Sequence, residues 1–186
     1  MTGLHHMLVH FPEAFWALAT LMVLVGALLS GRLAELSRAA LLPVLALSLL
    51  GAIAAIVSGF LVWSLEATLH SPLARNHLLM ALWSLGVYAL LAVLVWRAGP
   101  AAFDGARRWA LVILALVGAL LFAATGTLGG HLAGAPTAFS ELLRLTGWEV
   151  YTTFYAPTWA VAVMLLIALG AAVLGYRRRH RAGSGG

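Results

Sequence analysis

The sequence contains no cysteine and no lysine, and only 9% of its 186 residues carry a charge. Without cysteine, the chain cannot form disulfides, thiolate metal sites, iron–sulfur clusters of its own, covalent c-type haem links or a thiol nucleophile. Soluble domains carry about 25% charged residues. The scarcity of charge therefore argues against a soluble globular fold, a disordered chain and a nucleic-acid-binding domain, and we expect no nucleic-acid partner.

Long apolar segments are abundant in the sequence. Hydrophobic residues make up 63% of the chain, and the mean hydropathy is +1.00. A spanning helix needs about 20 mostly apolar residues, and five segments reach that length: 11–30, 41–65, 77–96, 109–130 and 157–176. We predict an all-α integral membrane protein, in which a four-helix transmembrane bundle and a fifth spanning helix lie in a lipid bilayer.

The connections divide the chain into four parts. We predict a four-helix membrane core (1–135), an outer-surface interfacial helix with an aromatic segment (136–156), the fifth transmembrane helix (157–176) and a basic, flexible cytoplasmic tail (177–186). Pro12 and Pro43 are expected in the first turns of their spans, where proline is tolerated.

Arginine is distributed unevenly between the two sides of the predicted bundle. Arginines of the first connection, the third connection and the tail lie on one side: Arg32, Arg38, Arg97, Arg107, Arg108, Arg177, Arg178, Arg179 and Arg181. Arg75 and Arg144 lie on the other. Because basic residues mark the cytoplasmic side, we predict an outer N-terminus and a cytoplasmic C-terminus, with five spans in the bacterial inner membrane.

This orientation gathers the ionisable chemistry at the outer face. Six of the seven histidines fall there: His5, His6, His10, His70, His77 and His131. If the first helix extends back through residue 6, then His6, His10 and Glu13 share one helical face. An ionisable residue within a span, as His77 is, indicates function by default, although interfacial or helix-orienting roles remain open for every one of these histidines.

Three chemistries are compatible with these residues. A single b-type haem needs two axial histidines on facing helices; we favour His10 with His77, and His131 as the substitute for either. Copper is the alternative, with imidazole and thioether ligands from His5, His6, His10, His77 and Met80. Glu13 and Glu66 are the candidates for handling protons.

The glycine patterns have two interpretations. Gly51, Ala55 and Gly59 recur every fourth residue, and Gly126 and Gly130 repeat the spacing before His131. Such stripes most often let two membrane helices pack closely. They also form a smooth wall against a flat macrocycle, so both roles stay open.

The N-terminal segment resembles the opening of a family of small bacterial membrane proteins catalogued only as a domain of unknown function. Its residues run Leu4-His5-His6-Met7-Leu8-Val9-His10-Phe11-Pro12-Glu13-Ala14, and the family pattern is close to Leu-His-Pro-x-Leu-Val-His-Phe-Pro-Ile-Ala. The residues that match are His5, His10, Phe11, Pro12 and Ala14, whereas His6 stands where the family has proline. The segments 51–59 and 75–77 are also similar.

The resemblance covers residues 4–135 and implies a four-helix membrane core, some of whose relatives are joined to Rieske-type or cytochrome-like electron carriers. The family's fourth helix ends near Gly-His-x-Gly-Gly-x-Leu-Val-Tyr-x-His-Gly. Here Thr127 and Pro136 stand where that pattern has histidines. The resemblance therefore implies that the family's ligands on this helix are absent or replaced by His131.

We expect a haem protein that transfers electrons at the periplasmic face, as a subunit of a respiratory complex. Its expected partners are a periplasmic cytochrome or Rieske-type carrier, a quinol and other membrane subunits. A non-catalytic accessory or anchor subunit and a periplasm-facing copper protein are the alternatives. Hydrolytic catalysis is disfavoured, because the sequence has neither a serine nucleophile motif nor a His-Glu-x-x-His pair. We expect an electron-transfer or accessory subunit rather than a self-contained enzyme.

Overall fold

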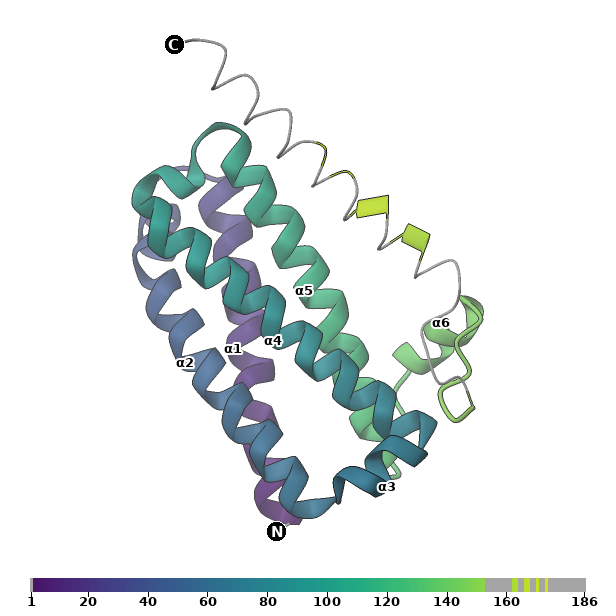
Figure 1. Ribbon diagram of the computed structural model, residues 1–186. Helices are drawn as coiled ribbons and strands as arrows, with labels where there is room; N and C mark the ends of the chain where they lie inside the picture. The colour runs from purple at the N-terminus through teal and green to yellow at the C-terminus, as the bar shows by residue number, and fades with distance from the viewer. Residues whose placement is uncertain (1, 153–161, 164–165, 168–169, 171–172, 174–186) are drawn as a thin grey trace.

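The computed structural model describes residues 2–152, 162–163, 166–167, 170 and 173 (Figure 1). Its elements are all helices: α1 (Thr2–Leu28), α2 (Arg32–Val62), α3 (Leu65–His70), α4 (Pro72–Ala98), the 3₁₀ helix η1 (Gly99–Phe103), α5 (Gly105–Leu132) and α6 (Phe139–Leu145). Among these, α1, α2, α4 and α5 are long and apolar enough to cross a membrane. The predicted all-α, multi-pass membrane class is confirmed for this part of the chain.

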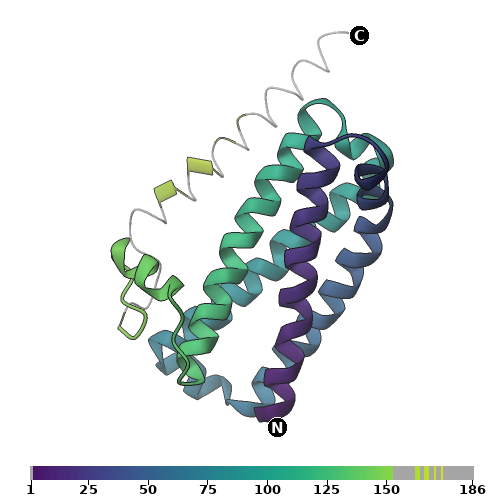
Figure 2. The same ribbon diagram turned by 180° about the vertical axis from the view of Figure 1, so that it is seen from behind.

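The four long helices form one bundle. α1 packs along α2 and α5, and α4 packs along the same two helices, so that α1 and α4 lie diagonally across the bundle. Figures 1 and 2 show the N-terminus, α3 and α6 at one end, and the α1–α2 and α4–α5 connections at the other. The expected fifth span, 157–176, lies outside the described residues apart from isolated positions, as does the tail 177–186.

The first two spans begin earlier than the sequence predicted. α1 begins at Thr2 and α2 at Arg32, so Pro12 and Pro43 lie inside helices and the first-turn expectation is wrong for both. Within a membrane bundle, neighbouring helices allow a spanning helix to continue through proline. Pro12 is buried against α2, where a side chain at Gly51 would meet its Cδ atom at 3.4 Å. Pro72, by contrast, does open α4, behind the N-cap Ser71.

A buried tyrosine holds the centre of the bundle. Tyr88 of α4 is fully buried, and its hydroxyl lies 2.8 Å from the Thr20 hydroxyl on α1. Its ring stacks on Trp16, with centroids 5.0 Å apart and planes inclined by 9°. Gly118 of α5 leaves the space for this ring, because an added Cβ would lie 2.9 Å from Tyr88 Cε2. One side chain thus joins three of the four long helices.

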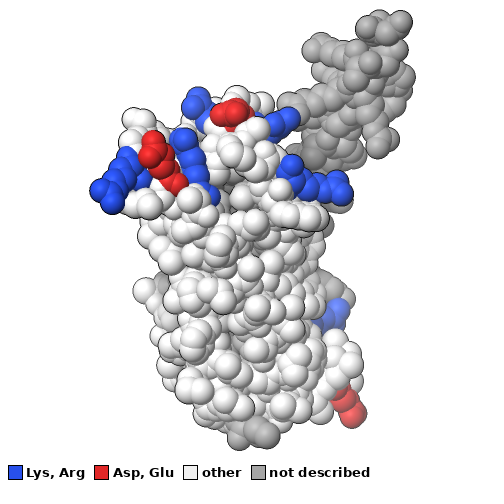
Figure 3. All heavy atoms as spheres, turned by 90° about the vertical axis from the view of Figure 1, so that its left-hand side faces the viewer, with Lys and Arg blue, Asp and Glu red and all other residues white. Residues whose placement is uncertain are grey.

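Charged residues concentrate at the end opposite the N-terminus. The ends of α2, α4 and α5 at that end carry the arginines Arg32, Arg38, Arg97, Arg107 and Arg108. Figure 3 shows blue side chains gathered there above an uncharged belt. Arg38 is tied to the bundle. Its Nε donates to the Gly26 carbonyl at 2.7 Å, and its guanidinium lies 5.3 Å from the centre of the Phe103 ring.

Candidate functional site

A cavity of about 690 Å³ opens among the four long helices at the end that holds the N-terminus. It lies between the start of α1, the end of α2, the start of α4 and the end of α5, and the α2–α4 connection adds Trp63 and Thr68. Ligand sites usually have volumes of about 300–1,000 Å³, with apolar walls and a few converging polar groups. This cavity has that character, because four histidines and a glutamate lie among mostly apolar neighbours.

The histidines reach the cavity from two diagonal helices. His5, His6 and His10 come from α1, and His77 comes from α4. His5 and His77 are partly buried, whereas His6 and His10 are exposed. Since α1 begins at Thr2, the condition for His6 and His10 to share a face with Glu13 is met. The cavity brings together four of the six histidines that the sequence assigned to the outer face.

His77 is held by the backbone of α5. Its Nδ1 lies 3.0 Å from the Thr125 carbonyl oxygen. A carbonyl only accepts, so Nδ1 carries the proton, and Nε2 of the neutral ring keeps its lone pair. Gly129 makes room for the ring, since a Cβ there would lie 3.0 Å from His77 Cε1.

His5 is held in the same way by α2. Its Nδ1 lies 3.0 Å from the Ser58 hydroxyl, and a Cβ at Gly59 would lie 3.1 Å from His5 Cε1. Both rings therefore rest against a glycine of a neighbouring helix and are hydrogen-bonded through Nδ1. The backbone of Ala55 is a further hydrogen-bond partner of the His5 ring.

The glycine stripes serve helix packing and make room for these side chains. Gly51 lies against Phe11 and Pro12, and Gly59 lies against His5. On α5, Gly126 lies against Glu13, whose Oε1 would be 3.0 Å from an added Cβ. The two stripes thus allow side chains of α1 to enter between the helices.

Glu13 is the acidic residue of the cavity. It is partly buried and belongs to the lining, as does His10 one turn earlier on α1. Glu66, the second predicted proton-handling residue, lies elsewhere. It is exposed on α3, where its backbone carbonyl accepts from His70 Nδ1 at 2.8 Å. Only Glu13 is therefore placed to exchange a proton with a group in the cavity.

Two other predicted ligands lie outside the cavity. His131 ends α5 and bonds through Nδ1 to the Tyr151 hydroxyl at 2.7 Å, with the rings edge to face. Met80 packs into a small apolar cluster that contains Trp148 and Val150. Trp148 is buried in this cluster, where it packs beside residues of α4 and α5.

The copper ligand set is not assembled in this structure. Among residues 2–152 and the other described positions, no group of three or more His, Cys, Asp or Glu side chains is arranged to hold a metal ion. The nitrogen donors of the cavity are the imidazoles of His5, His6, His10 and His77.

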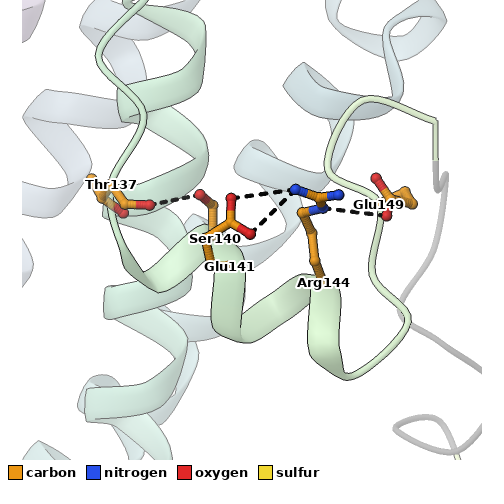
Figure 4. A network of polar contacts seen from close by, with 5 residues as sticks. All are labelled: Thr137, Ser140, Glu141, Arg144 and Glu149. Carbon is orange, nitrogen blue, oxygen red and sulfur yellow. Dashed lines mark hydrogen bonds and ion pairs between the residues drawn. The ribbon is translucent and has the colours of Figure 1, made fainter.

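The short helix α6 carries a polar network beside the cavity end (Figure 4). The Arg144 guanidinium lies 3.2 Å from the Glu141 carboxylate and 3.5 Å from Glu149. These carboxylates, that of Glu141 first, raise the pKa of Arg144 above its usual value. All of these side chains are exposed, so the network organises a surface loop rather than a site.

Comparison with protein-family models, with curated proteins and with solved structures gives no match for this chain. The resemblance of residues 4–135 to a family of unknown function stays a prediction, and the function has to be argued from the cavity. Sequence reasoning missed the supports of the two histidines, Ser58 and the Thr125 carbonyl. No spacing rule could have found them, because each joins helices that are distant in sequence.

Proposed function

We propose that the chain is a b-type haem protein of the bacterial inner membrane, with His5 and His77 as the two axial ligands. It passes electrons at the outer face as a subunit of a respiratory complex. The single observation that supports this most is the matched pair of imidazoles on diagonal helices. Each has its Nδ1 engaged by a neighbouring helix and its Nε2 available within one cavity.

The donor set fits haem b. A metal-bound histidine nearly always donates its other ring proton to a carbonyl or another acceptor, which fixes the ring and its tautomer. His77 has this arrangement with the Thr125 carbonyl. Haem supplies a one-electron iron couple when bound and brings four nitrogen ligands of its own, so two protein ligands suffice. The proposal therefore requires only two protein side chains as ligands to the iron.

His5 replaces His10 in the pair that the sequence favoured. His10 lines the cavity but is exposed, and the structure gives its ring no hydrogen bond from another helix. His5 is partly buried and is braced by α2. A braced imidazole binds more tightly than a mobile one, because it loses less conformational freedom on ligation.

The arginine distribution supports the outer location of the cavity. Five arginines lie at the far end of the described bundle, and Arg75 and Arg144 lie at the cavity end. By the positive-inside rule, the far end is cytoplasmic and the cavity faces the periplasm. A periplasmic cytochrome or Rieske-type carrier then meets the cavity end directly. When a quinol is the electron donor, one of its hydroxyl protons would pass to the carboxylate of Glu13, which lies against Gly126 of α5.

The test is the reduced-minus-oxidised visible spectrum of the detergent-purified protein from haem-supplied cells, with iron measured on the same sample. We expect one haem per chain with a b-type α-band. His5→Ala and His77→Ala should each remove or strongly shift this band. His70→Ala is the matched control, because His70 is exposed on α3 outside the cavity, and its spectrum should equal that of the wild type.

Three outcomes contradict the proposal in distinguishable ways. If only His10→Ala and His77→Ala remove the band, the pair favoured by the sequence holds and His5 is not a ligand. If haem is bound but every histidine variant keeps the wild-type spectrum, the cavity is not the site. A protein without haem that co-purifies with membrane subunits leaves the accessory-subunit function.

A further inference from the structure

We propose that Ser58 is a positioning residue that fixes the proton of His5 on Nδ1 and thereby keeps its Nε2 lone pair available to a ligand in the cavity. That Nε2 receives haem iron rests on the proposed function. The tautomer of His5 does not, because it follows from the hydrogen bonds alone. Ser58 lies on α2 and His5 on α1, so the effect crosses a helix interface.

The direction of each hydrogen bond can be assigned from the number of protons. The Ser58 hydroxyl lies 2.8 Å from the Ala55 carbonyl oxygen and 3.0 Å from His5 Nδ1. A hydroxyl has a single proton and a carbonyl oxygen has none, so the Ser58 proton belongs to the bond with Ala55. The bond to His5 then needs a proton from the ring. The chain runs from His5 Nδ1–H to the Ser58 oxygen, and from the Ser58 hydroxyl to Ala55.

Burial makes this arrangement specific. Ser58 is 6% exposed, so little water reaches the hydroxyl to replace either bond. The ring of His5 is pressed against Gly59, whose added Cβ would lie 3.1 Å from Cε1. The ring is therefore held in contact with the serine by shape as well as by the hydrogen bond.

The tautomers of His5 and His77 are fixed by different kinds of hydrogen-bond acceptor. His77 donates to the Thr125 main-chain oxygen, which every residue at that position supplies. His5 bonds to the Ser58 side chain at 3.0 Å, with the Ala55 carbonyl beside it. A single substitution can therefore release the proton of His5 and leave His77 as an internal reference in the same protein.

The matched control lies on the same helix. Ser48 is fully buried on α2, and its hydroxyl donates to the Leu45 carbonyl at 2.7 Å. It thus repeats the bond between Ser58 and Ala55 three residues back along the helix, without a histidine beyond it. Ser48→Ala removes the same atoms from the same helix as Ser58→Ala, and the two variants differ only in their effect on His5.

The first measurement is made on the haem-free protein. Nitrogen-15 spectra of labelled histidine side chains distinguish the Nδ1–H tautomer from the Nε2–H tautomer, and His5→Gln and His77→Gln assign the two signals. We expect both rings as Nδ1–H in the wild type. In Ser58→Ala, the His5 signal should shift to the Nε2–H form while His77 stays unchanged. Ser48→Ala should leave both signals in place, and Ser58→Thr should restore that of His5.

The second measurement is haem titration of the same variants. Loss of a supporting hydrogen bond costs about 10- to 100-fold in affinity at metal sites, so Ser58→Ala should bind haem 10- to 100-fold more weakly than Ser48→Ala. A wild-type His5 in the Nε2–H form, or a tautomer that Ser58→Ala does not alter, overturns the inference. A wild-type protein that binds no haem refutes the proposed function alone, because the tautomer result stands without haem.

Discussion

Replacing Gly118 with alanine should destabilise the bundle, although alanine is the better helix former. The added Cβ would lie 2.9 Å from Tyr88 Cε2 and 3.0 Å from Cζ. Carbon atoms pack best at about 3.5–4.0 Å, so the ring has to move by roughly 0.6 Å or α5 has to separate from α4. Neither is easy, because Tyr88 is fully buried, stacked on Trp16 and bonded to Thr20 at 2.8 Å.

The net magnitude follows from three terms. Overpacking a closely packed core costs about 1–3 kcal/mol, and a weakened hydrogen bond between Tyr88 and Thr20 costs about 1 kcal/mol. The higher helix propensity of alanine relative to glycine offsets about 1 kcal/mol of this cost. The expected loss is about 1–3 kcal/mol. For a chain of this size, a loss of 2 kcal/mol corresponds to a decrease in Tm of roughly 4–8 °C.

The assay is thermal unfolding in mild detergent, followed by circular dichroism, with Gly86→Ala as the control. Gly86 lies within α4, and nothing lies within 4 Å of an added Cβ there. This variant should have the wild-type Tm or a higher one, because alanine stabilises a helix interior by up to about 1 kcal/mol relative to glycine. If Gly118→Ala is as stable as Gly86→Ala, then Tyr88 does not pack against α5 as described, and the core assignment fails.

Four further predictions concern single contacts. Arg38→Met should cost about 1 kcal/mol in unfolding free energy by the same assay, because Gly26 loses its guanidinium donor. Arg144→Gln should leave the Tm unchanged, since exposed ion pairs contribute little. Because the carboxylates of Glu141 and Glu149 raise the pKa of Arg144, the wild-type guanidinium should stay charged throughout the mildly alkaline range, as arginine nitrogen NMR can check. Gly129→Ala places a Cβ 3.0 Å from the ring of His77 and should weaken haem binding about tenfold in titration.

The membrane core could be predicted from composition and apolar length, whereas the start of the first helix could not. Residues 2–10 contain three histidines, so a hydropathy criterion places the beginning of the span after them. The helix nevertheless begins at Thr2. Its first turns pack on the end of α2, where Gly59 and Ser58 accommodate His5. Tertiary contacts with α2 stabilise these first turns of α1 as helix, and the local sequence pattern does not contain that information.

In the candidate site too, some features could be predicted from the sequence and others required the structure. The arginine pattern was enough to assign most histidines to one end, because it needs only the order of spans and loops. The choice between His5 and His10 needed helix partners. Both line the cavity, yet only His5 has a hydrogen-bond acceptor on a neighbouring helix. Spacing along α1 cannot reveal this, since the acceptor is 53 residues away in the sequence.

The position of the cavity limits how the proposed haem can work. Below it the bundle closes around Trp16, Tyr88 and Leu91, all buried, and the sequence places no histidine between His77 and His131 or between His10 and His70. The halves of the four described spans that lie away from the cavity therefore offer no histidine pair for a second haem. A single haem at one end cannot carry electrons across the bilayer by itself. If the proposed function holds, donor and acceptor would both have to reach the cavity end, and the chain would act as a relay there, with Glu13 as the carboxylate of the cavity that could accept a proton.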